Sequence, residues 1–509
     1  MTQADYDGSS PIATEPETDV VEYNTGILYG LMDKPPVGEA AFVAMQHVLA
    51  SFVGIITPPL LICSALGVEP TSTSFIISMS LFASGLCTFI QCKRIGPVGS
   101  GLLSLQGTSF AFLGPIIGIG TAAVNGGATP EQALALIFGV CFFGSSVEII
   151  LSRFLHLAQE IITPLVAGTV VMIIGLSLIK TGIFSLAGGG PAKRVSGIFA
   201  QPENLGLSEV TVDGVLFKAS NAFGSTQNLV LGFLVLAIVT ALTLSSNRIL
   251  RMGAIAIGLM IGYVIAFFLG IVNFSNLSQL PFFRFPIPLR FGFDFNFAAF
   301  APFIILYLIT AVETIGDLTA TSAVSGEPVK GPIYFRRIKG GVLGDGVNSA
   351  IAALLNTFPN TTFSQNNGVI QMTGVASRYV GFFVAGIFVI LGLVPVVGGV
   401  FQAIPQPVLG GATLIMFGSI AVAGLNIVAS TGLDRRSIIL VAISLALGLG
   451  VVYFPEIFDG KPALIKNIFS SGISTGGLAA IVLNIVLPGR PKVPSYREAI
   501  AESEAEAES

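Results

Sequence analysis

The sequence predicts an all-α polytopic membrane protein, and three features of the chain support that prediction. Its 509 residues have a mean hydropathy of +0.85. Only 10% of the residues are charged, whereas a soluble domain carries about 25%. Apolar runs recur from residue 40 to residue 488, each near the roughly 20 residues that a helix needs to cross a bilayer.

Fourteen segments qualify as candidate spans, although several contain polar or glycine-rich stretches. Their predicted bounds are 40–62, 73–91, 97–118, 132–151, 161–180, 228–246, 252–272, 298–323, 340–356, 359–376, 380–400, 405–426, 437–454 and 469–488. With the N-terminus placed in the cytoplasm, the cytoplasmic segments hold most of the 24 Lys and Arg residues. This bias favours an even number of spans and two cytoplasmic termini.

Both ends of the sequence are polar. Residues 1–39 lack the basic and apolar regions of a signal peptide and predict a cytoplasmic tail, as do residues 489–509. Between the tails we expect seven spans over 40–272, an extracellular connection over 273–297 and seven more over 298–488. The connection contains LRFGFDFNF, whose alternating phenylalanines fit either a short amphipathic strand or an interfacial lid.

The two halves contain matching segments. An offset of 243 residues aligns three pairs: Pro164 with Pro407, Gly168 with Gly411, and Gly175 with Gly418. The polar stretches LQGTSFAF (105–112) and NTTFSQNNG (360–368) interrupt the third span of each half. An odd number of spans per half would invert the second half relative to the first, as in transporters whose binding sites lie at broken helices.

Four ionisable side chains stand out in the predicted spans. Glu313 and Asp317 are four residues apart and share a helix face, Asp345 begins the ninth span, and His47 lies in the first. Each is costly in a bilayer and so requires a function or a structural partner. The structural alternatives are a backbone-bonded carboxyl for Glu313, a tie between helices for Asp317, a helix cap for Asp345 and a helix-to-helix hydrogen bond for His47.

The stretch TTFSQNNGVIQMTG (361–374) concentrates amides and hydroxyls in one apolar region. Gln365 and Asn366 both donate and accept hydrogen bonds, and they must face protein, water or ligand because unpaired amides are expensive in lipid. No Arg or Lys accompanies them, which favours a neutral, planar, hydrogen-bonding solute over an anion. Phe110, in the matching stretch of the first half, offers a ring for stacking or for ordinary packing.

SQNNGVIQMTG resembles the signature of the nucleobase–ascorbate transporter family. The matching residues are Gln365, Asn366, Gly368, Thr373 and Gly374. Further segments resemble the family in the same order: QH at 46–47, GTSFAF at 107–112, ETIGDLTATS at 313–322 and GGVLGDGVNS at 340–349. The resemblance covers about residues 35–490, and QNNGVIQMTGVASRYVG is most similar to the bacterial xanthine and uric acid permeases.

The resemblance implies fourteen spans in two inverted repeats of seven, core and gate domains, short strands in spans three and ten, and a homodimer in the inner membrane. It implies symport of a purine base with protons, by alternating access and without a further cofactor. The implied substrate-binding set is Glu313, Gln365, Phe110, Ser109, Ser364 and Asn366, with Phe110 stacking on the base. Asp345, Asp317 and His47 would support the site or the proton coupling, and Glu313 and Asp345 are the candidates for the proton itself.

Two residues bear on selectivity. By resemblance, Gln365 favours oxidised purines, whereas a uracil permease is expected to carry Glu there. Ser109 stands where xanthine-selective relatives are expected to carry Asn. The smaller side chain would leave room for the 8-oxo group of uric acid.

Other classes of protein fit less well. A uracil or other nucleobase permease of the same family stays open, as does an anion transporter of the same seven-plus-seven fold, which often carries a soluble domain after the last span. An enzyme is not expected, because neither clustered metal ligands nor the aspartate spacing of an intramembrane protease is present. A channel would conduct without saturation and without Glu313. The net charge of −4 argues against nucleic acid as a partner, which leaves membrane lipid and a small solute.

Overall fold

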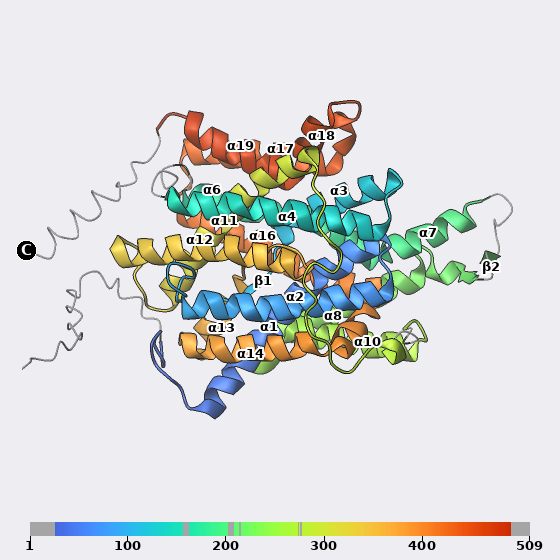
Figure 1. Cartoon of the computed structure of the whole chain (residues 1–509), viewed down its shortest axis with the longest axis horizontal. Coiled ribbons are helices and arrows are strands. Elements are labelled where there is room, and N and C mark those ends of the chain that lie inside the picture. Colours follow the sequence, from blue (N-terminus) through green and yellow to red (C-terminus); the bar gives the residue numbers. More distant parts are fainter. Residues whose placement is uncertain are drawn as a thin grey trace, which may run out of the picture.

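Helices dominate the computed structural model, which describes residues 26–489 except 156–160, 162, 202–207, 213, 214, 273, 275 and 276. Most of the long helices run side by side along the long axis of the molecule (Figure 1). Within the described ranges, eight helices are long and apolar enough to cross a membrane. The number is nine if the bent pair α14 (Arg378–Leu393) and α15 (Pro395–Gln402) forms one span. The predicted polytopic helical membrane protein is confirmed.

Every predicted span overlaps at least one element. The earlier helices are α1 (Val37–Leu66), α2 (Pro70–Lys93), α3 (Leu113–Asn125), α4 (Pro130–Arg153), α6 (Pro164–Leu186), α7 (Gly189–Phe199), α8 (Thr226–Thr243), α9 (Arg248–Met252) and α10 (Ala254–Phe268). The later ones are α11 (Phe297–Val324), α12 (Gly331–Leu354), α13 (Gln365–Thr373), α16 (Gln406–Ser430), α17 (Arg435–Tyr453), α18 (Ala463–Phe469) and α19 (Gly472–Val486). Two strand pairs accompany them, β1 (Gln106–Thr108) with β4 (Asn360–Thr362) and β2 (Glu209–Val212) with β3 (Val215–Lys218).

Helix starts follow local sequence signals. Thr129 and Gln132 form a capping box at α4: the Thr129 hydroxyl accepts from the Gln132 backbone N–H at 3.2 Å. The Gln132 side chain accepts from the Thr129 N–H at 2.8 Å. At α17 the Asp434 carboxylate accepts from the Ser437 N–H at 2.7 Å, and hydrogen bonding by Ser437 holds the pKa of Asp434 below its usual value. These caps satisfy backbone donors that the first turn of a helix leaves unpaired.

Helices α6 and α16 approach each other so closely that glycine is required on both. A Cβ atom on Gly168 would lie 2.9 Å from the carbonyl oxygen of Gly424, and one on Gly424 would lie 2.6 Å from the oxygen of Gly168. Close approach through small residues is the usual way in which membrane helices gain packing energy. The contact is reciprocal, so a larger side chain at either position separates the helices.

The segment between α6 and α8 contains regular structure. Helix α7 and the β2–β3 hairpin lie within it, and both project beyond one end of the long helices (Figure 1).

The connection expected over 273–297 forms a strap, which we define as residues 281–296, and no strand is present in it. Its backbone is tied to three helices. The Arg284 N–H donates to the carbonyl of Leu393 at 3.1 Å, the Leu289 N–H to that of Leu354 at 2.9 Å and the Asp294 N–H to that of Ala135 at 3.0 Å. Rings of the strap also meet the helices, as Phe293 does with Phe142 at 5.2 Å between centroids. Of the two alternatives, the strand is excluded.

Replacing Gly424 with Leu should destabilise the protein by about 1–3 kcal/mol, because the side chain would overlap the backbone of α6. Gly418→Leu is the matched control, since a Cβ at Gly418 on the same helix meets nothing within 4 Å. Thermal unfolding of both variants in detergent measures the difference. Equal losses of stability would contradict the packing described here.

Candidate functional site

The two interrupted segments meet at a short antiparallel strand pair. Gln106 lies opposite Thr362, Gly107 opposite Thr361 and Thr108 opposite Asn360. Two further bonds flank the pair, from the Ser109 N–H to the Pro359 carbonyl at 2.8 Å and from the Phe363 N–H to the Leu105 carbonyl at 3.0 Å. Non-helical backbone at membrane depth needs such partners. The prediction of short strands in these two segments is confirmed, and we call their meeting point the strand crossing.

A helix begins directly after each strand. The 3₁₀ turn η1 (Phe110–Phe112) leads from β1 into α3, and α13 follows β4. Because the strands are antiparallel, the two helices leave in opposite directions and both have their N-terminal ends beside the strand crossing. N-terminal ends carry unpaired N–H groups and the positive end of the helix dipole. The arrangement suits a polar solute with hydrogen-bond acceptors.

Asp345 lies deep within a network of donors. Its carboxylate accepts from Gln91 Nε2 at 2.8 Å and from Thr314 Oγ1 at 2.5 Å. It is fully buried within α12, which begins at Gly331. The alternative that Asp345 caps a helix start is therefore wrong.

Asp317 connects α11 to the strand crossing. Thr362 Oγ1, on β4, donates to Asp317 Oδ2 at 3.2 Å. The contact joins a helix to a strand, whereas the structural alternative for Asp317 was a tie between helices.

Glu313 lies one turn from Asp317 on α11 and differs from it in its bonding. Its Oε2 atom is buried and has no hydrogen-bond partner among the residues that the structure describes. A bond from neighbouring backbone, the structural alternative for Glu313, is not seen there. Glu313 therefore lies beside the strand crossing with a carboxyl oxygen that can accept a further hydrogen bond.

The signature residues of α13 divide into anchored and open side chains. Asn366 is buried, and its Nδ2 donates to the carbonyl of Leu103, while its Oδ1 has no partner in the described chain. Asn367 Oδ1 accepts from Thr321 Oγ1 of α11 at 2.8 Å. Gln365 and Ser364 are half-buried, and the structure gives their side chains no hydrogen bond with described residues. The anchored amides of Asn366 and Asn367 therefore fix the start of α13, where the Gln365 side chain remains available to bind a solute.

Of the first-half residues, Ser109 and Phe110 follow β1 directly, and His47 lies on α1. Phe110 is buried, with its ring edge-on to Phe417 of α16 at 5.4 Å between centroids, so it packs between α16 and the crossing. The Ser109 hydroxyl is buried, and it has no partner within the described ranges. His47 is fully buried on α1, and neither ring nitrogen has a partner among described residues, so the expected helix-to-helix bond is not formed.

Buried polar atoms without partners gather around the strand crossing. Those of the described residues include Gln106 Nε2, Thr108 Oγ1, Ser109 Oγ, Glu313 Oε2, Asn360 Oδ1 and Asn366 Oδ1. Each unpaired buried group costs about 1–3 kcal/mol. Buried polar groups are almost always paired in native proteins. The concentration indicates a place where water and a bound solute complete the hydrogen bonding.

Sequence reasoning missed two buried polar residues. Gln91 on α2 donates to Asp345 and to the Gly341 carbonyl at 3.0 Å, and accepts from the Ser100 N–H at 2.8 Å. Glu148 on α4 is 1% exposed and accepts from Thr310 Oγ1 at 2.6 Å. Both lie in predicted spans, so a search of every span for amides and carboxyls, rather than for the least apolar stretches, would have found them.

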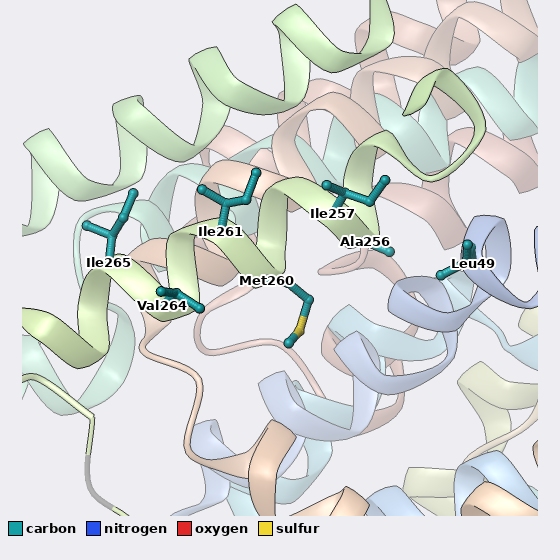
Figure 2. A pocket seen from close by; sticks show the side chains of 7 residues that line it. All are labelled: Leu49, Ala256, Ile257, Met260, Ile261, Val264 and Ile265. Atoms are coloured by element: carbon teal, nitrogen blue, oxygen red, sulfur yellow. The ribbon is translucent and has the colours of Figure 1, made fainter. Parts of the chain in front are cut away.

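An apolar pocket elsewhere does not compete with the strand crossing as a solute site. It lies along α10 against Leu49 of α1, and its lining side chains carry only hydrocarbon and thioether groups (Figure 2). Such a lining cannot pair the N–H and C=O groups of a polar solute.

Comparison with known proteins identifies the family. A model described as "Permease family" matches residues 38–217 and 204–457. Xanthine permease XanP of Escherichia coli (strain K12) is 49% identical over 466 residues, which are 91% of this chain and 95% of that protein. Xanthine permease XanQ of the same strain is 43% identical over 93% of this chain and 96% of its own length.

A solved structure shares the fold at low sequence identity. The murine Solute Carrier 26 family member A9 anion transporter, in the inward-facing state, gives a TM-score of 0.55 at 11% identity, over 89% of this chain and 68% of that one. Taken with the permease relatives, the fold and the interrupted helices define a membrane transporter and not an enzyme. The chain belongs to the permease family of nucleobase–ascorbate transporters.

Gln91→Leu should lower the stability of the folded protein by about 2–4 kcal/mol, because Asp345, Gly341 and Ser100 each lose the hydrogen bond that they make with Gln91. Gln365→Leu should change stability by no more than about 0.5 kcal/mol, since Gln365 holds no described group in place. Thermal unfolding in the same detergent compares the two. A large loss in Gln365→Leu would mean that this amide has a structural function.

Proposed function

We propose that this chain is a proton-coupled symporter that imports oxidised purine bases, xanthine or uric acid, across the plasma membrane by alternating access. The observation that carries the proposal is the strand crossing, where two helix starts meet beside Glu313 and Gln365. The names of the E. coli relatives, both xanthine permeases, support the purine class.

The chemistry of the site suits an oxopurine. Such a base presents adjacent ring N–H and C=O groups on a planar edge. Glu313 has the acceptor capacity for an N–H, and the Gln365 amide can donate to a C=O and accept from an N–H at once. Phe110 stacks on the ring, while Ser364 and backbone N–H groups at the start of α13 add donors.

Glu313 is the better candidate for the coupling proton. Asp345 accepts bonds from Gln91 and Thr314, and donors of this kind favour the charged form of a carboxyl. Glu313 Oε2 accepts no hydrogen bond from a described residue, so a negative charge on this carboxyl is poorly compensated. Protonation removes the free-energy cost of burying that charge. In this scheme protonated Glu313 binds the base and loses its proton on the cytoplasmic side, whereas Asp317, Asp345 and His47 position the site.

The proposed architecture has fourteen spans in two inverted repeats, divided into core and gate domains. To the eight long helices we add the bent α14–α15 pair, the three shorter apolar helices, α12 and the β4–α13 segment. Helices α6 and α16 both carry Pro in their first turn and contain the aligned pairs of the two halves. The first and last described segments lie at the same end of the bundle (Figure 1), which supports two cytoplasmic termini. A homodimer is proposed by family resemblance alone.

Ser109 supports uric acid as a second substrate. Its side chain is small, and its hydroxyl has no described partner, so it is available to an 8-oxo group beside the crossing. Uracil remains the alternative substrate, and competition of unlabelled uracil with labelled xanthine distinguishes the two substrate classes.

Cells expressing the chain should take up labelled xanthine saturably. Excess uric acid and a protonophore should block the uptake, whereas uracil should not. If unlabelled xanthine inhibits the uptake and uric acid does not, the argument from Ser109 is rejected, whereas the family assignment stands. A verified, membrane-inserted protein that transports neither xanthine nor uric acid would overturn the substrate class.

Gln365→Ala should raise the KM for xanthine by about 10- to 100-fold, because two hydrogen bonds to one edge of the base are lost. Gln371→Ala is the matched control, an exposed glutamine on the same helix, and its KM should stay within about twofold of the wild type. Initial uptake rates over a range of xanthine concentrations give both values. Similar KM values for the two variants would remove Gln365 from the site.

A further inference from the structure

Glu148 is a buried carboxyl that the proposed substrate site does not use. It lies on α4 and is 1% exposed. Its Oε1 atom accepts from Thr310 Oγ1 at 2.6 Å, whereas its Oε2 atom has no partner among the described residues. Within the described chain, the neutral Thr310 hydroxyl is thus the one hydrogen-bond partner of the Glu148 carboxyl.

Such surroundings do not compensate a negative charge. In the described chain, no lysine, arginine or histidine forms an ion pair with Glu148, and the ion pairs present join other residues. Removing a carboxylate from water without a counter-ion costs several kcal/mol. The neutral, protonated form of Glu148 avoids this cost, and its O–H is then a donor.

Glu148 lies beside the carboxyls of the proposed site. Helices α4 and α12 are in close contact next to Asp345: a Cβ atom added at Gly346 would lie 3.1 Å from the Glu148 Cβ atom. Thr310 and Thr314, one turn apart on α11, donate to Glu148 and Asp345 respectively. The Glu148 carboxyl interacts electrostatically with both Asp345 and Glu313.

The basic residues on the helices packed against Glu148, which are Arg336, Arg337 and Lys339 of α12 and Arg153 of α4, form no ion pair with it in the described chain. The titratable groups nearest to it are acidic or neutral: Asp345 from α12, Glu313 and Tyr307 from α11, and Cys141 from α4 itself, whose carbonyl accepts the Tyr307 hydroxyl bond at 2.7 Å. Helix α3, which also packs on α4, contributes no titratable side chain. Repulsion among carboxyls is therefore the dominant charge interaction at this place.

We propose that Glu148 is a second proton-carrying carboxyl of the transport cycle, an inference that rests on the proposed proton symport. A charged Asp345 or Glu313 keeps a proton on Glu148. When a proton arrives at one of them, the repulsion ends, burial alone then holds the Glu148 proton, and that proton can leave. One proton enters the cluster and one departs, so the charge of the cluster is the same before and after. Glu148 is five residues from Arg153 at the end of α4, about 7–8 Å along the helix, and the proton leaves toward that end.

The test separates exchange of the base from its accumulation. The full chain is reconstituted in liposomes, and labelled xanthine is followed in two assays, counterflow without a pH gradient and accumulation driven by an inward proton gradient. Glu148→Gln keeps the size and the hydrogen bond of the protonated carboxyl but carries no proton. Glu131→Gln is the matched control, an exposed carboxyl at the other end of the same helix.

Glu148→Gln should retain counterflow within about twofold while its gradient-driven accumulation falls about tenfold or more, because only the coupled step needs an exchangeable proton. Glu131→Gln should match the wild type in both assays. Wild-type accumulation with an unchanged pH profile in Glu148→Gln overturns the proposal, as does loss of counterflow in a folded variant, which would make Glu148 a structural residue.

Two further outcomes are informative. If Glu148→Gln does not fold, Glu148→Asp replaces it, and its accumulation should persist with the midpoint of the pH profile moved by about half a pH unit or more. An unmoved midpoint overturns the proposal. A wild-type protein that accumulates xanthine without responding to the proton gradient refutes the proton symport itself, and that result is visible before any variant is made.

Discussion

The hydrogen bonds between β1 and β4 are the interaction on which the rest of the structure depends. They let two helices be interrupted in the middle of an apolar bundle, because each strand supplies the backbone partners that lipid cannot. Each interruption then creates a helix start in the interior. Without the strand pair, Gln365 would lie within a continuous helix and its neighbours would have no reason to be polar.

Helix α11 organises the polar interior around that pair. Four side chains on one of its faces each bind a different element: Thr310 binds Glu148 of α4, Thr314 binds Asp345 of α12, Asp317 binds Thr362 of β4 and Thr321 binds Asn367 of α13. The spacing of three and four residues keeps all four on one side. Elements far apart in the sequence are thereby fixed against a single helix.

The sequence predicted the membrane class, the approximate place of every long helix and the two polar interruptions, because each of these produces a regional pattern in hydropathy. It did not predict isolated polar residues such as Gln91 and Glu148, since one amide or carboxyl barely changes the hydropathy of a span. The start of α12 was placed too late, because the basic stretch before Lys339 is typical of a loop but continues the helix. The bonding of Asp345 depends on Gln91 and Thr314, which are distant in sequence, and no local pattern contains them.

The strap over residues 281–296 has a practical consequence for labelling this protein. Surface connections usually tolerate insertions, but this one bridges α4, α12 and α14 through its backbone. An epitope inserted there would pull on three helices at once. The β2–β3 hairpin projects beyond the long helices (Figure 1), and the backbone of its described strands makes no hydrogen bond with them. It is the better place for a tag or a crystallisation partner.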